Sequence, residues 1–214
     1  MYEELKRICD SIATTPGIRV AVFRGAGDKA FVSGSDIQQF VDLQEDEAYE
    51  VAVDAIFHSL QHLPIPTIAL IEGLAVGSGL LIATACDFRI STVDARFGIP
   101  VAKTLGNCLS PSNLSWIANH LGVPMVKRML LTAELIKAPE LLASGYLYQT
   151  ASPEEIVAVT EVLANKLAVL APITQKASKV TLARLLESNL PDCTELMRET
   201  YNSVDFKEGV NAFL

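Results

Sequence analysis

The residues most able to do chemistry in this 214-residue chain lie in two glycine-containing turns, Ser33-Gly34-Ser35-Asp36 and Gly77-Ser78-Gly79. Each turn follows a predicted strand, and the second turn also opens a helix with almost no polar face. The first N–H groups of a helix have no partner inside the helix and lie at the positive end of its dipole. Two converging N–H donors can stabilise the negative oxygen of a thioester enolate or tetrahedral intermediate. The two turns therefore predict an oxyanion hole built from backbone amides.

Ser78 also invites a second interpretation, in which its hydroxyl is a nucleophile. The residues around it do not form the Gly-x-Ser-x-Gly pattern of hydrolases, because Val76 and Leu80 occupy the flanking positions. A serine nucleophile needs a nearby base, and His120 is the only histidine downstream. Cys108 is a further candidate nucleophile. We favour a role for the Ser78 backbone N–H over either nucleophile.

The elements that must position these turns alternate between strands and helices in the first half of the chain. The sequence pattern predicts a helix over 2–14, a strand over 19–24, a loop over 29–36, a helix over 46–62, a buried strand from 68, an apolar helix that ends near 86, and a strand over 88–91. This order is typical of an α/β unit with a mostly parallel sheet.

The second half of the chain is predicted to be almost entirely helical from Ser112 onward. It contains a helix over 153–171 that Pro172 breaks, another that runs to about 187, and a last one over 205–214. At this length we expect a single functional unit. Its parts are an α/β core over 1–111 that carries the oxyanion turns and a helical region over 112–214 that packs on the core and on neighbouring subunits.

Composition narrows the class of partner. The net charge of −8, with few basic clusters, argues against nucleic acid or an anionic membrane as the main partner. No signal-peptide pattern is visible, and we expect a cytoplasmic protein. The four cysteines show no Cys-x-x-Cys spacing and are expected to be buried thiols rather than disulfides or zinc ligands. The histidines fit no metal pattern, so we expect no metal. The cysteines are Cys9, Cys86, Cys108 and Cys193, and the histidines are His58, His62 and His120.

Both turns lie in sequence contexts that resemble the crotonase superfamily, the enoyl-CoA hydratase/isomerase family. Ala30-Phe-Val-Ser-Gly-Ser-Asp-Ile37 is similar to the family's Ala-Phe-x-Ala-Gly-Ala-Asp-Ile loop. Ile71-Glu-Gly-Leu-Ala-Val-Gly-Ser-Gly79 is similar to its Val-Asn-Gly-x-Ala-x-Gly-Gly-Gly segment. Further similarity at 85–89, 95–98 and 205–213 extends the resemblance over essentially the whole chain.

The resemblance implies a crotonase-like (ClpP/crotonase spiral) α/β core with a mostly parallel sheet and a helical C-terminal trimerisation region. It also implies an acyl-CoA thioester as the substrate, with coenzyme A present only as part of that substrate, and a homotrimer or homohexamer. The backbone N–H groups of Ser35 and Ser78 would hold the thioester oxygen. The substrate-binding residues implied are Lys29, Ala30, Ser33, Asp36, Ile37, Gln38, Leu81, Val101 and Asn107.

This sequence departs from the family pattern at the two positions where hydratases carry glutamates. Leu81 and Val101 occupy these positions, and no aspartate or glutamate occurs between 95 and 133 or between 74 and 85. The family's usual bases are therefore absent. Hydration still needs a group of matched pKa to move a proton. Asn107 either holds a water or substrate carbonyl or joins Ser110 and Ser112 in capping the helix that begins there.

Three hypotheses follow, in order of preference. The first is an acyl-CoA enzyme of the enoyl-CoA hydratase/isomerase type that stabilises an enolate without the standard glutamates. The second is a thioester hydrolase that uses Ser78 or Cys108, and the third is a non-catalytic acyl-CoA-binding or assembly protein. Met1 falls at an internal position of the family pattern, which predicts either a late assigned start or a shortened form with an exposed sheet edge.

Overall fold

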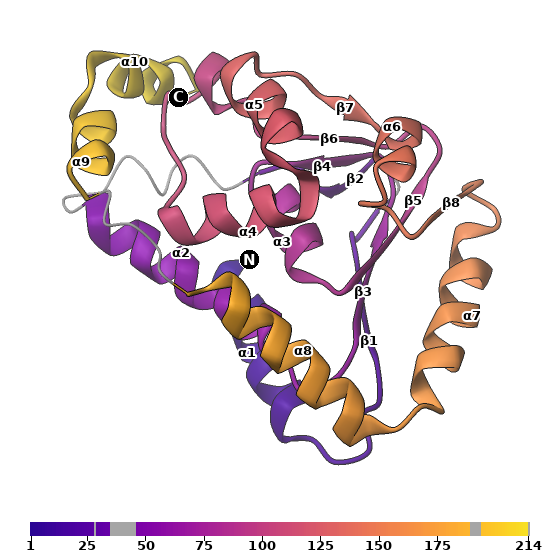
Figure 1. The fold of residues 1–214 in the computed structure, drawn as a ribbon. Helices are drawn as coiled ribbons and strands as arrows, with labels where there is room; N and C mark the ends of the chain where they lie inside the picture. The colour runs from indigo at the N-terminus through magenta and orange to yellow at the C-terminus, as the bar shows by residue number, and fades with distance from the viewer. Residues whose placement is uncertain (28, 35–45, 189–193, 214) are drawn as a thin grey trace.

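The computed structural model describes residues 1–27, 29–34, 46–188 and 194–213. Two four-stranded sheets form the framework, and the first six strands of the chain alternate between them (Figure 1). The first sheet has the order β1 (Ala21–Arg24), β3 (Thr67–Ile71), β5 (Phe88–Thr92) and β8 (Gln149–Ala151), with every neighbouring pair parallel. The second has the order β2 (Ala30–Val32), β4 (Leu74–Val76), β6 (Arg96–Gly98) and β7 (Ile136–Lys137), and only β6 and β7 are antiparallel. The predicted α/β class with mostly parallel sheets is confirmed.

Helices cover both faces of the first sheet. The described helices are α1 (Tyr2–Thr14), α2 (Asp46–Gln61), α3 (Ser78–Ala85), α4 (Pro111–Leu121), α5 (Val123–Leu131), α6 (Ala138–Ala143), α7 (Ile156–Ala168), α8 (Pro172–Leu186), α9 (Thr194–Asn202) and α10 (Val204–Phe213), with a 3-10 turn at Val101–Lys103. In Figure 1, α7 lies on one side of β3 and β5, whereas α9 and α10 lie at the opposite end of the molecule.

Strand β3 shows why the sheet is covered on both faces. All five of its residues are buried, which fits the continuous apolar run that predicted it. Side chains on a strand alternate between faces, so Ile68 and Leu70 join the cluster that packs under α7, whereas Ala69 and Ile71 join the larger core with α1, α2 and α3. The central strand therefore connects two separate hydrophobic clusters.

Helix α3 is the most deeply buried helix end to end, since each of its eight residues is buried. A buried helix must still satisfy the carbonyl groups of its last turn. Arg89, which is itself buried, donates to the carbonyl oxygens of Ala83 at 3.3 Å and Cys86 at 2.6 Å, and it also donates to the Tyr146 carbonyl at 2.8 Å. Trp116 Nε1 donates to the Thr84 carbonyl at 3.0 Å. A cation at this end also suits the negative end of the helix dipole.

A second buried network fixes α8 to the sheet. The Nζ of Lys179 on α8 lies 2.7 Å from Oδ2 of Asp87, and both groups are mostly buried. The same Oδ2 accepts hydrogen bonds from the Thr67 backbone N–H at 2.7 Å and the Thr67 hydroxyl at 2.8 Å. One carboxylate therefore joins the starts of β3 and β5 to helix α8.

The structure corrects four of the predicted elements. The loop predicted over 29–36 contains strand β2, and a separate strand β4 precedes the second turn; each has only three residues, too few to show a period. Strands β7 and β8 lie in the region predicted to be helical and complete the two sheets. The helix predicted over 153–171 begins at Ile156 and ends at Ala168, and Pro172 opens α8 rather than breaking a helix.

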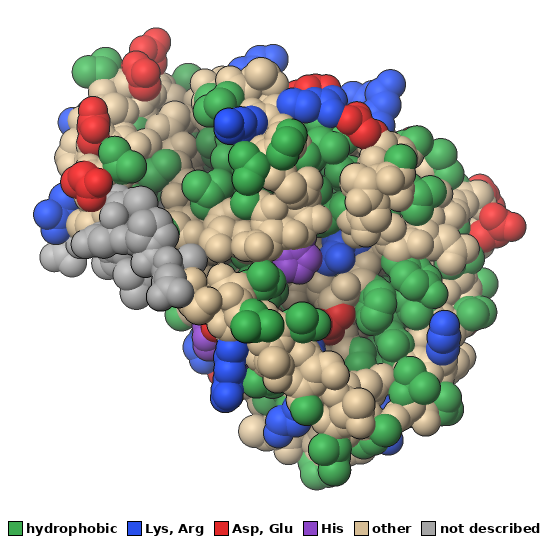
Figure 2. Space-filling view, in the orientation of Figure 1, with side chains coloured by type: hydrophobic (Ala, Val, Ile, Leu, Met, Phe, Trp, Pro, Cys, Tyr) green, Lys and Arg blue, Asp and Glu red, His purple; other side chains and the backbone are tan. Residues whose placement is uncertain are grey.

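Helices α7 and α8 carry apolar side chains on their outer surfaces. Figure 2 shows hydrophobic side chains spread over the face that these helices form, and the most exposed are Val162, Val169, Ile173, Leu182 and Leu185. Within the described ranges, no single helix has the length and apolar character to cross a membrane. Helices α7 and α8 meet that test only as a pair, bent by 105°.

Replacing Arg89 by methionine tests the importance of the C-terminal end of α3. The substitution leaves the carbonyls of Ala83, Cys86 and Tyr146 without their donor, so we expect the free energy of unfolding to fall by about 3 kcal/mol or more. Urea unfolding followed by circular dichroism measures the change. Arg96→Met, at an exposed position on β6, is the matched control and should change stability by less than about 0.5 kcal/mol. Equal losses in the two variants would contradict this role.

Candidate active site

The two predicted turns meet because their strands are neighbours. Strands β2 and β4 pair in parallel, with Ala30 opposite Leu74 and Val32 opposite Ala75, so both strands end at the same edge of the second sheet. The turn after β2 then lies directly against the turn after β4. A Cβ atom placed on Gly77 would lie 3.6 Å from Cα of Gly34. Segments that are more than 40 residues apart in the chain therefore form one surface.

Close backbone contacts require glycine at two positions of this arrangement. A Cβ atom on Gly79 would lie 2.1 Å from the carbonyl oxygen of Val32, and one on Gly73 would lie 2.1 Å from the carbonyl oxygen of Lys29. Neither distance is possible for a real side chain, and in both cases the obstructing atom is backbone. The glycines therefore set how closely the β4 segment approaches the β2 segment.

The first turn of α3 has amides that no helical carbonyl can satisfy. The Gly77 N–H donates to the Gly98 carbonyl at 2.9 Å, and the N–H groups of Leu80 and Leu81 donate to the Gly77 carbonyl at 3.1 and 3.3 Å. Ser78 and Gly79 occupy the first two helical positions, whose N–H groups have no intrahelical acceptor. The Ser78 hydroxyl is buried and has no hydrogen-bond partner in the described part of the chain. This corner can accept a ligand oxygen.

Comparison of the sequence with known protein families identifies the family. The sequence model of the enoyl-CoA hydratase/isomerase family matches residues 1–214. The chain belongs to the enoyl-CoA hydratase/isomerase family.

Individual relatives of this family member agree with the match. The chain is 29% identical to the short-chain-enoyl-CoA hydratase of Clostridium acetobutylicum, over 99% of this chain and 83% of that protein. It is 33% identical to the (E)-benzylidenesuccinyl-CoA hydratase of Thauera aromatica, over 88% of this chain and 73% of that protein. The structure of methylmalonyl-CoA decarboxylase in complex with 2-nitronate-propionyl-CoA superposes with a TM-score of 0.90 at 26% identity, covering 99% of this chain and 84% of that one. The crotonase-type fold is confirmed.

The substrate-binding residues implied by the family resemblance fall into three groups. Ser35, Asp36, Ile37 and Gln38 lie outside the described residues, so the second oxyanion amide stays a prediction. Lys29 and Ser33 flank β2 and are exposed, whereas Ala30 is the first residue of β2 and is half-buried. Leu81 is buried on α3, whereas Val101 and Asn107 lie on the segment that follows β6. The structure thus brings the β2 residues next to the α3 turn.

Val101 and Asn107 line a common cavity of about 640 Å³. Helices α9 and α10 also line it, through residues such as Met197, Thr200 and Asp205. The Oδ1 atom of Asn107 is buried without a hydrogen-bond partner in the described structure. An unpaired acceptor in a cavity of this size can receive a donor from a bound small molecule. The capping role, by contrast, belongs to Ser110, whose hydroxyl accepts from the Asn113 backbone N–H at 3.2 Å.

The candidate nucleophiles lie away from the required bases. Trp116 contacts His120, with ring centroids 5.1 Å apart, and donates to the Thr84 carbonyl in the last turn of α3. Ser78 precedes Thr84 by six residues on α3, which corresponds to a rise of about 9 Å along the helix axis. The structure therefore places Ser78 and His120 toward opposite ends of α3. Cys108 packs against the cluster formed by Tyr201, Phe206 and Val210.

The buried thiols are unsuited to nucleophilic chemistry. Burial raises the pKa of Cys9 to about 11 and the pKa of Cys86 to about 12, so that both are protonated at neutral pH. Both side chains are buried in the main core and form no disulfide. For these two residues, the expectation of buried thiols is confirmed.

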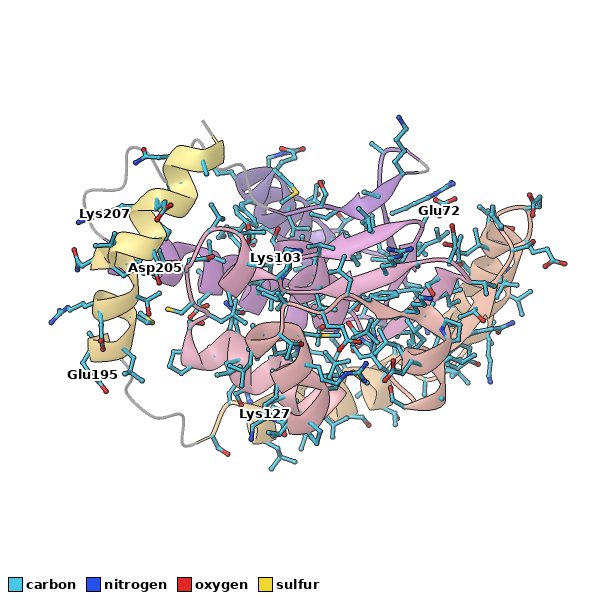
Figure 3. The ribbon with its side chains drawn as sticks, turned by 90° about the horizontal axis from the view of Figure 1, so that it is seen from above. Glu72, Lys103, Lys127, Glu195, Asp205 and Lys207 are labelled. Carbon is cyan, nitrogen blue, oxygen red and sulfur yellow. The ribbon has the colours of Figure 1, made fainter. Side chains whose placement is uncertain are left out.

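Two buried or half-buried carboxylates were not singled out from the sequence. Glu72 follows β3 and forms a bidentate ion pair with Arg24, with N–O distances of 2.7 and 3.0 Å. Figure 3 shows Glu72 on the opposite side of the molecule from Asp205 and Lys207 on α10. Asp54 on α2 accepts through one atom, Oδ1, from the Ser110 hydroxyl at 2.7 Å and from Nδ2 of Asn113 at 2.6 Å. It joins α2 to the start of α4, next to the segment that lines the cavity.

Replacing Gly79 by alanine tests how tightly the two turns are packed. The added methyl group meets the Val32 carbonyl, so the turns must separate, and we expect the free energy of unfolding to fall by about 1–3 kcal/mol. Thermal and urea unfolding measure this change. Gly27→Ala is the matched control, because a Cβ atom there meets nothing within 4 Å. If Gly79→Ala is as stable as the control, the turns are not held at the spacing described.

Replacing Asp54 by asparagine tests the cost of its charge. Burial raises the pKa of Asp54, although the Ser110 hydroxyl acts in the opposite direction. The folded protein then binds the proton more tightly than the unfolded chain, so ionised Asp54 lowers stability above the folded pKa, and this cost disappears as pH falls to about 4. Asparagine keeps Oδ1 as an acceptor, and we expect it to raise stability at pH 7 by less than about 1 kcal/mol, with a smaller gain at pH 4.

Urea unfolding of wild type and variant across this pH range provides the measurement. Asp54→Ala removes the acceptor itself and should lower stability at both pH values, by about 1–3 kcal/mol. The quantity to compare is the stability of Asp54→Asn minus that of wild type. If this difference is more negative at pH 7 than at pH 4, the charge of Asp54 is favourable.

Proposed function

We propose that this protein binds an acyl-CoA thioester and stabilises the enolate of its acyl group. The backbone N–H of Ser78 donates to the thioester oxygen, and the N–H of Ser35 is the second donor. The observation that carries this proposal is the contact between the Ser33–Gly34 turn and the Gly77–Ser78 turn at the start of α3. Family membership supports the class of substrate.

Burial makes this position effective for an anion. Helix α3 is enclosed along its whole length, so water screens its dipole and its first amides poorly. Negative charge that develops on the thioester oxygen is stabilised by donors that are already oriented. Removing one such donor from an oxyanion hole typically lowers the rate by about 10²–10³-fold. Most of the proposed catalysis therefore comes from backbone groups.

The route to the enolate is a second question, because Leu81 and Val101 replace the family's glutamates. Removing an α-proton requires a base, whereas loss of CO2 from a 2-carboxyacyl thioester does not. In that reaction the bond between the α-carbon and the carboxylate breaks, and its electron pair moves into the enolate. A proton from solvent then completes the product. The apolar side chains and the fold shared with methylmalonyl-CoA decarboxylase favour decarboxylation as the second candidate reaction.

We further propose that the chain forms a homotrimer or homohexamer. The exposed apolar side chains of α7 and α8 support an assembly, because an extended apolar surface of this kind is typical of an interface.

Replacing Ser78 by proline removes the proposed donor and keeps the helix. Proline suits the first helical position, where an N–H has no helical partner to lose. We expect the variant to fold and to form the enolate about 10²–10³-fold more slowly. The measurement is deuterium incorporation at the α-carbon in heavy water, with a panel of simple, 2-enoyl and 2-carboxyacyl thioesters of coenzyme A.

Ser78→Ala is the matched control because it keeps the backbone N–H and removes only the hydroxyl. It should retain the wild-type rate within a few-fold. A rate abolished by alanine, with thioester hydrolysis in the wild type, would indicate a Ser78 nucleophile instead. Heat protection by coenzyme A without deuterium incorporation or CO2 release from any thioester would indicate a non-catalytic binding protein. CO2 release from the 2-carboxyacyl members alone would establish the decarboxylase alternative.

A further inference from the structure

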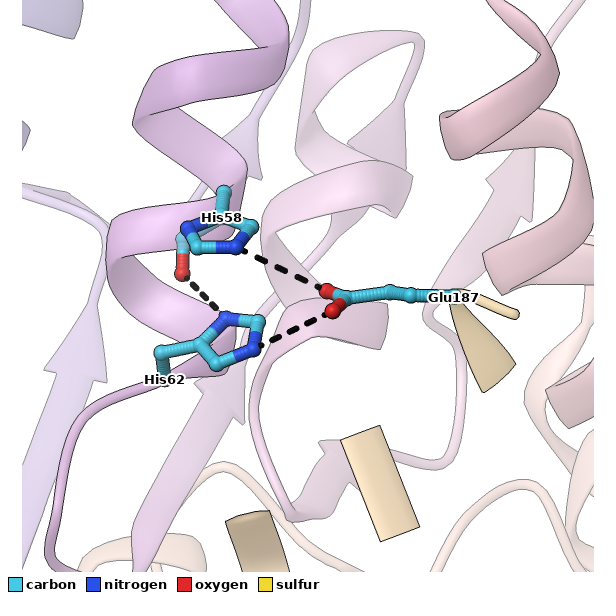
Figure 4. A group of neighbouring side chains, drawn as sticks. All are labelled: His58, His62 and Glu187. Atoms are coloured by element: carbon cyan, nitrogen blue, oxygen red, sulfur yellow. Dashed lines mark hydrogen bonds and ion pairs between the residues drawn. The ribbon is translucent and has the colours of Figure 1, made fainter. Parts of the chain in front are cut away.

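Two histidines and one glutamate come together where the end of α2 meets the end of α8. His58 lies in the last turn of α2, and His62 follows four residues later, so both rings project from one side of the helix (Figure 4). Glu187 follows α8 and reaches between them. Its carboxylate oxygens lie 3.8 Å from Nε2 of His58 and 3.3 Å from Nε2 of His62. One potential ligand atom from each side chain lies within 4.8 Å of the other two.

The orientation of His62 leaves a ring nitrogen directed at the carboxylate. Its Nδ1 lies 2.9 Å from the backbone carbonyl oxygen of His58, and because a carbonyl can only accept, Nδ1 carries the proton. In the neutral ring, Nε2 then presents a lone pair to a carboxylate oxygen 3.3 Å away. Two such atoms repel each other unless a proton or a metal cation lies between them. A backbone carbonyl that fixes the remote nitrogen is also the usual support of a metal-binding histidine.

We propose that His58, His62 and Glu187 form a binding site for a divalent transition-metal ion of the zinc type. Imidazole nitrogen and carboxylate oxygen are ligands that Zn²⁺ accepts in a three-residue site with water in the remaining position. Ca²⁺ and Mg²⁺ prefer all-oxygen sites, so this ligand set disfavours them. In the part of the chain that the structure describes, no other group of three histidine, cysteine or acidic side chains brings its ligand atoms this close together.

The distances allow an ion to enter with small side-chain movements. Ligands at about 2.1 Å from a tetrahedral ion lie about 3.4 Å apart, which is close to the 3.3 Å between His62 and Glu187. His58 must move further, and it can do so because 61% of its side chain is exposed. The two rings already stack with centroids 3.8 Å apart.

Such an ion would connect segments that lie 125 residues apart in the sequence. Its consequence is measurable as metal-dependent stability, without reference to acyl-CoA turnover, because a ligand that binds only the folded chain raises the unfolding midpoint.

The test is titration of the metal-free full-length protein with ZnCl2, followed by calorimetry and by thermal unfolding. We expect one Zn²⁺ per chain and an unfolding midpoint that rises with Zn²⁺ concentration. His58→Gln, His62→Gln and Glu187→Gln should each weaken binding by at least about 10-fold. Co²⁺ should give the visible absorption of a tetrahedral nitrogen and oxygen site, without the thiolate band that cysteine ligands would add.

His120→Gln is the matched control. His120 makes the same type of contact, from Nδ1 to the backbone carbonyl of Trp116 at 2.8 Å, but it lies outside the cluster. This variant should bind Zn²⁺ like the wild type. Zn²⁺ binding that is equal in wild type and in all three cluster variants would overturn the proposal. So would a midpoint that Zn²⁺ does not change while Glu187→Gln lowers it, since the cluster would then be an ion pair with protonated histidine.

Discussion

The structure depends on helix α3, all eight residues of which are buried. Because α3 is enclosed, each polar group at its ends needs a partner from the protein or from a ligand. At the carbonyl end the partners are Arg89 and Trp116, which are also buried. At the amide end Gly77 is satisfied by β6, and Ser78 is not satisfied by the helix. The carbonyl groups at the C-terminal end of α3 therefore have donors from the protein, whereas the N–H group of Ser78 at the N-terminal end is left for an anionic ligand.

The sheets bring the second component to this open end. Parallel strands end at the same edge of a sheet, so the pairing of β2 with β4 is sufficient to place one turn beside the other. Glycine at 73 and 79 then permits the backbones to touch. The remaining interactions, among them the Lys179–Asp87 ion pair under α8 and the Asp54 contacts at the start of α4, hold the surrounding helices in place.

The elements with a long, strong pattern could be predicted from the sequence, and those defined by pairing could not. The buried strand predicted from Ile68 and the helix predicted over 2–14 correspond to β3 and α1. Strands β2, β4 and β7 have three residues or fewer, and only their neighbours in the sheet define them. The start of α7 was misplaced because Ser152 accepts bonds through its carbonyl in a preceding turn, while its hydroxyl contacts the Glu155 side chain.

The site was predictable to the extent that short motifs carry it. The turn at Ser78 was identified by its glycines and its apolar helix, whereas the role of Arg89 depends on carbonyls that come together only in the fold. The histidine cluster was missed because Glu187 lies far along the chain. The spacing of His58 and His62, one helical turn apart, was the only signal available in the sequence.

The contact between α10 and the segment after β6 limits what the cavity can hold. A Cβ atom on Gly209 would lie 2.6 Å from the Leu105 carbonyl oxygen, and one on Gly106 would lie 3.2 Å from the backbone of Asp205. Main chain therefore meets main chain at this wall. Replacing a side chain by a smaller one cannot deepen the cavity here, so a longer ligand would have to displace helix α10 as a whole.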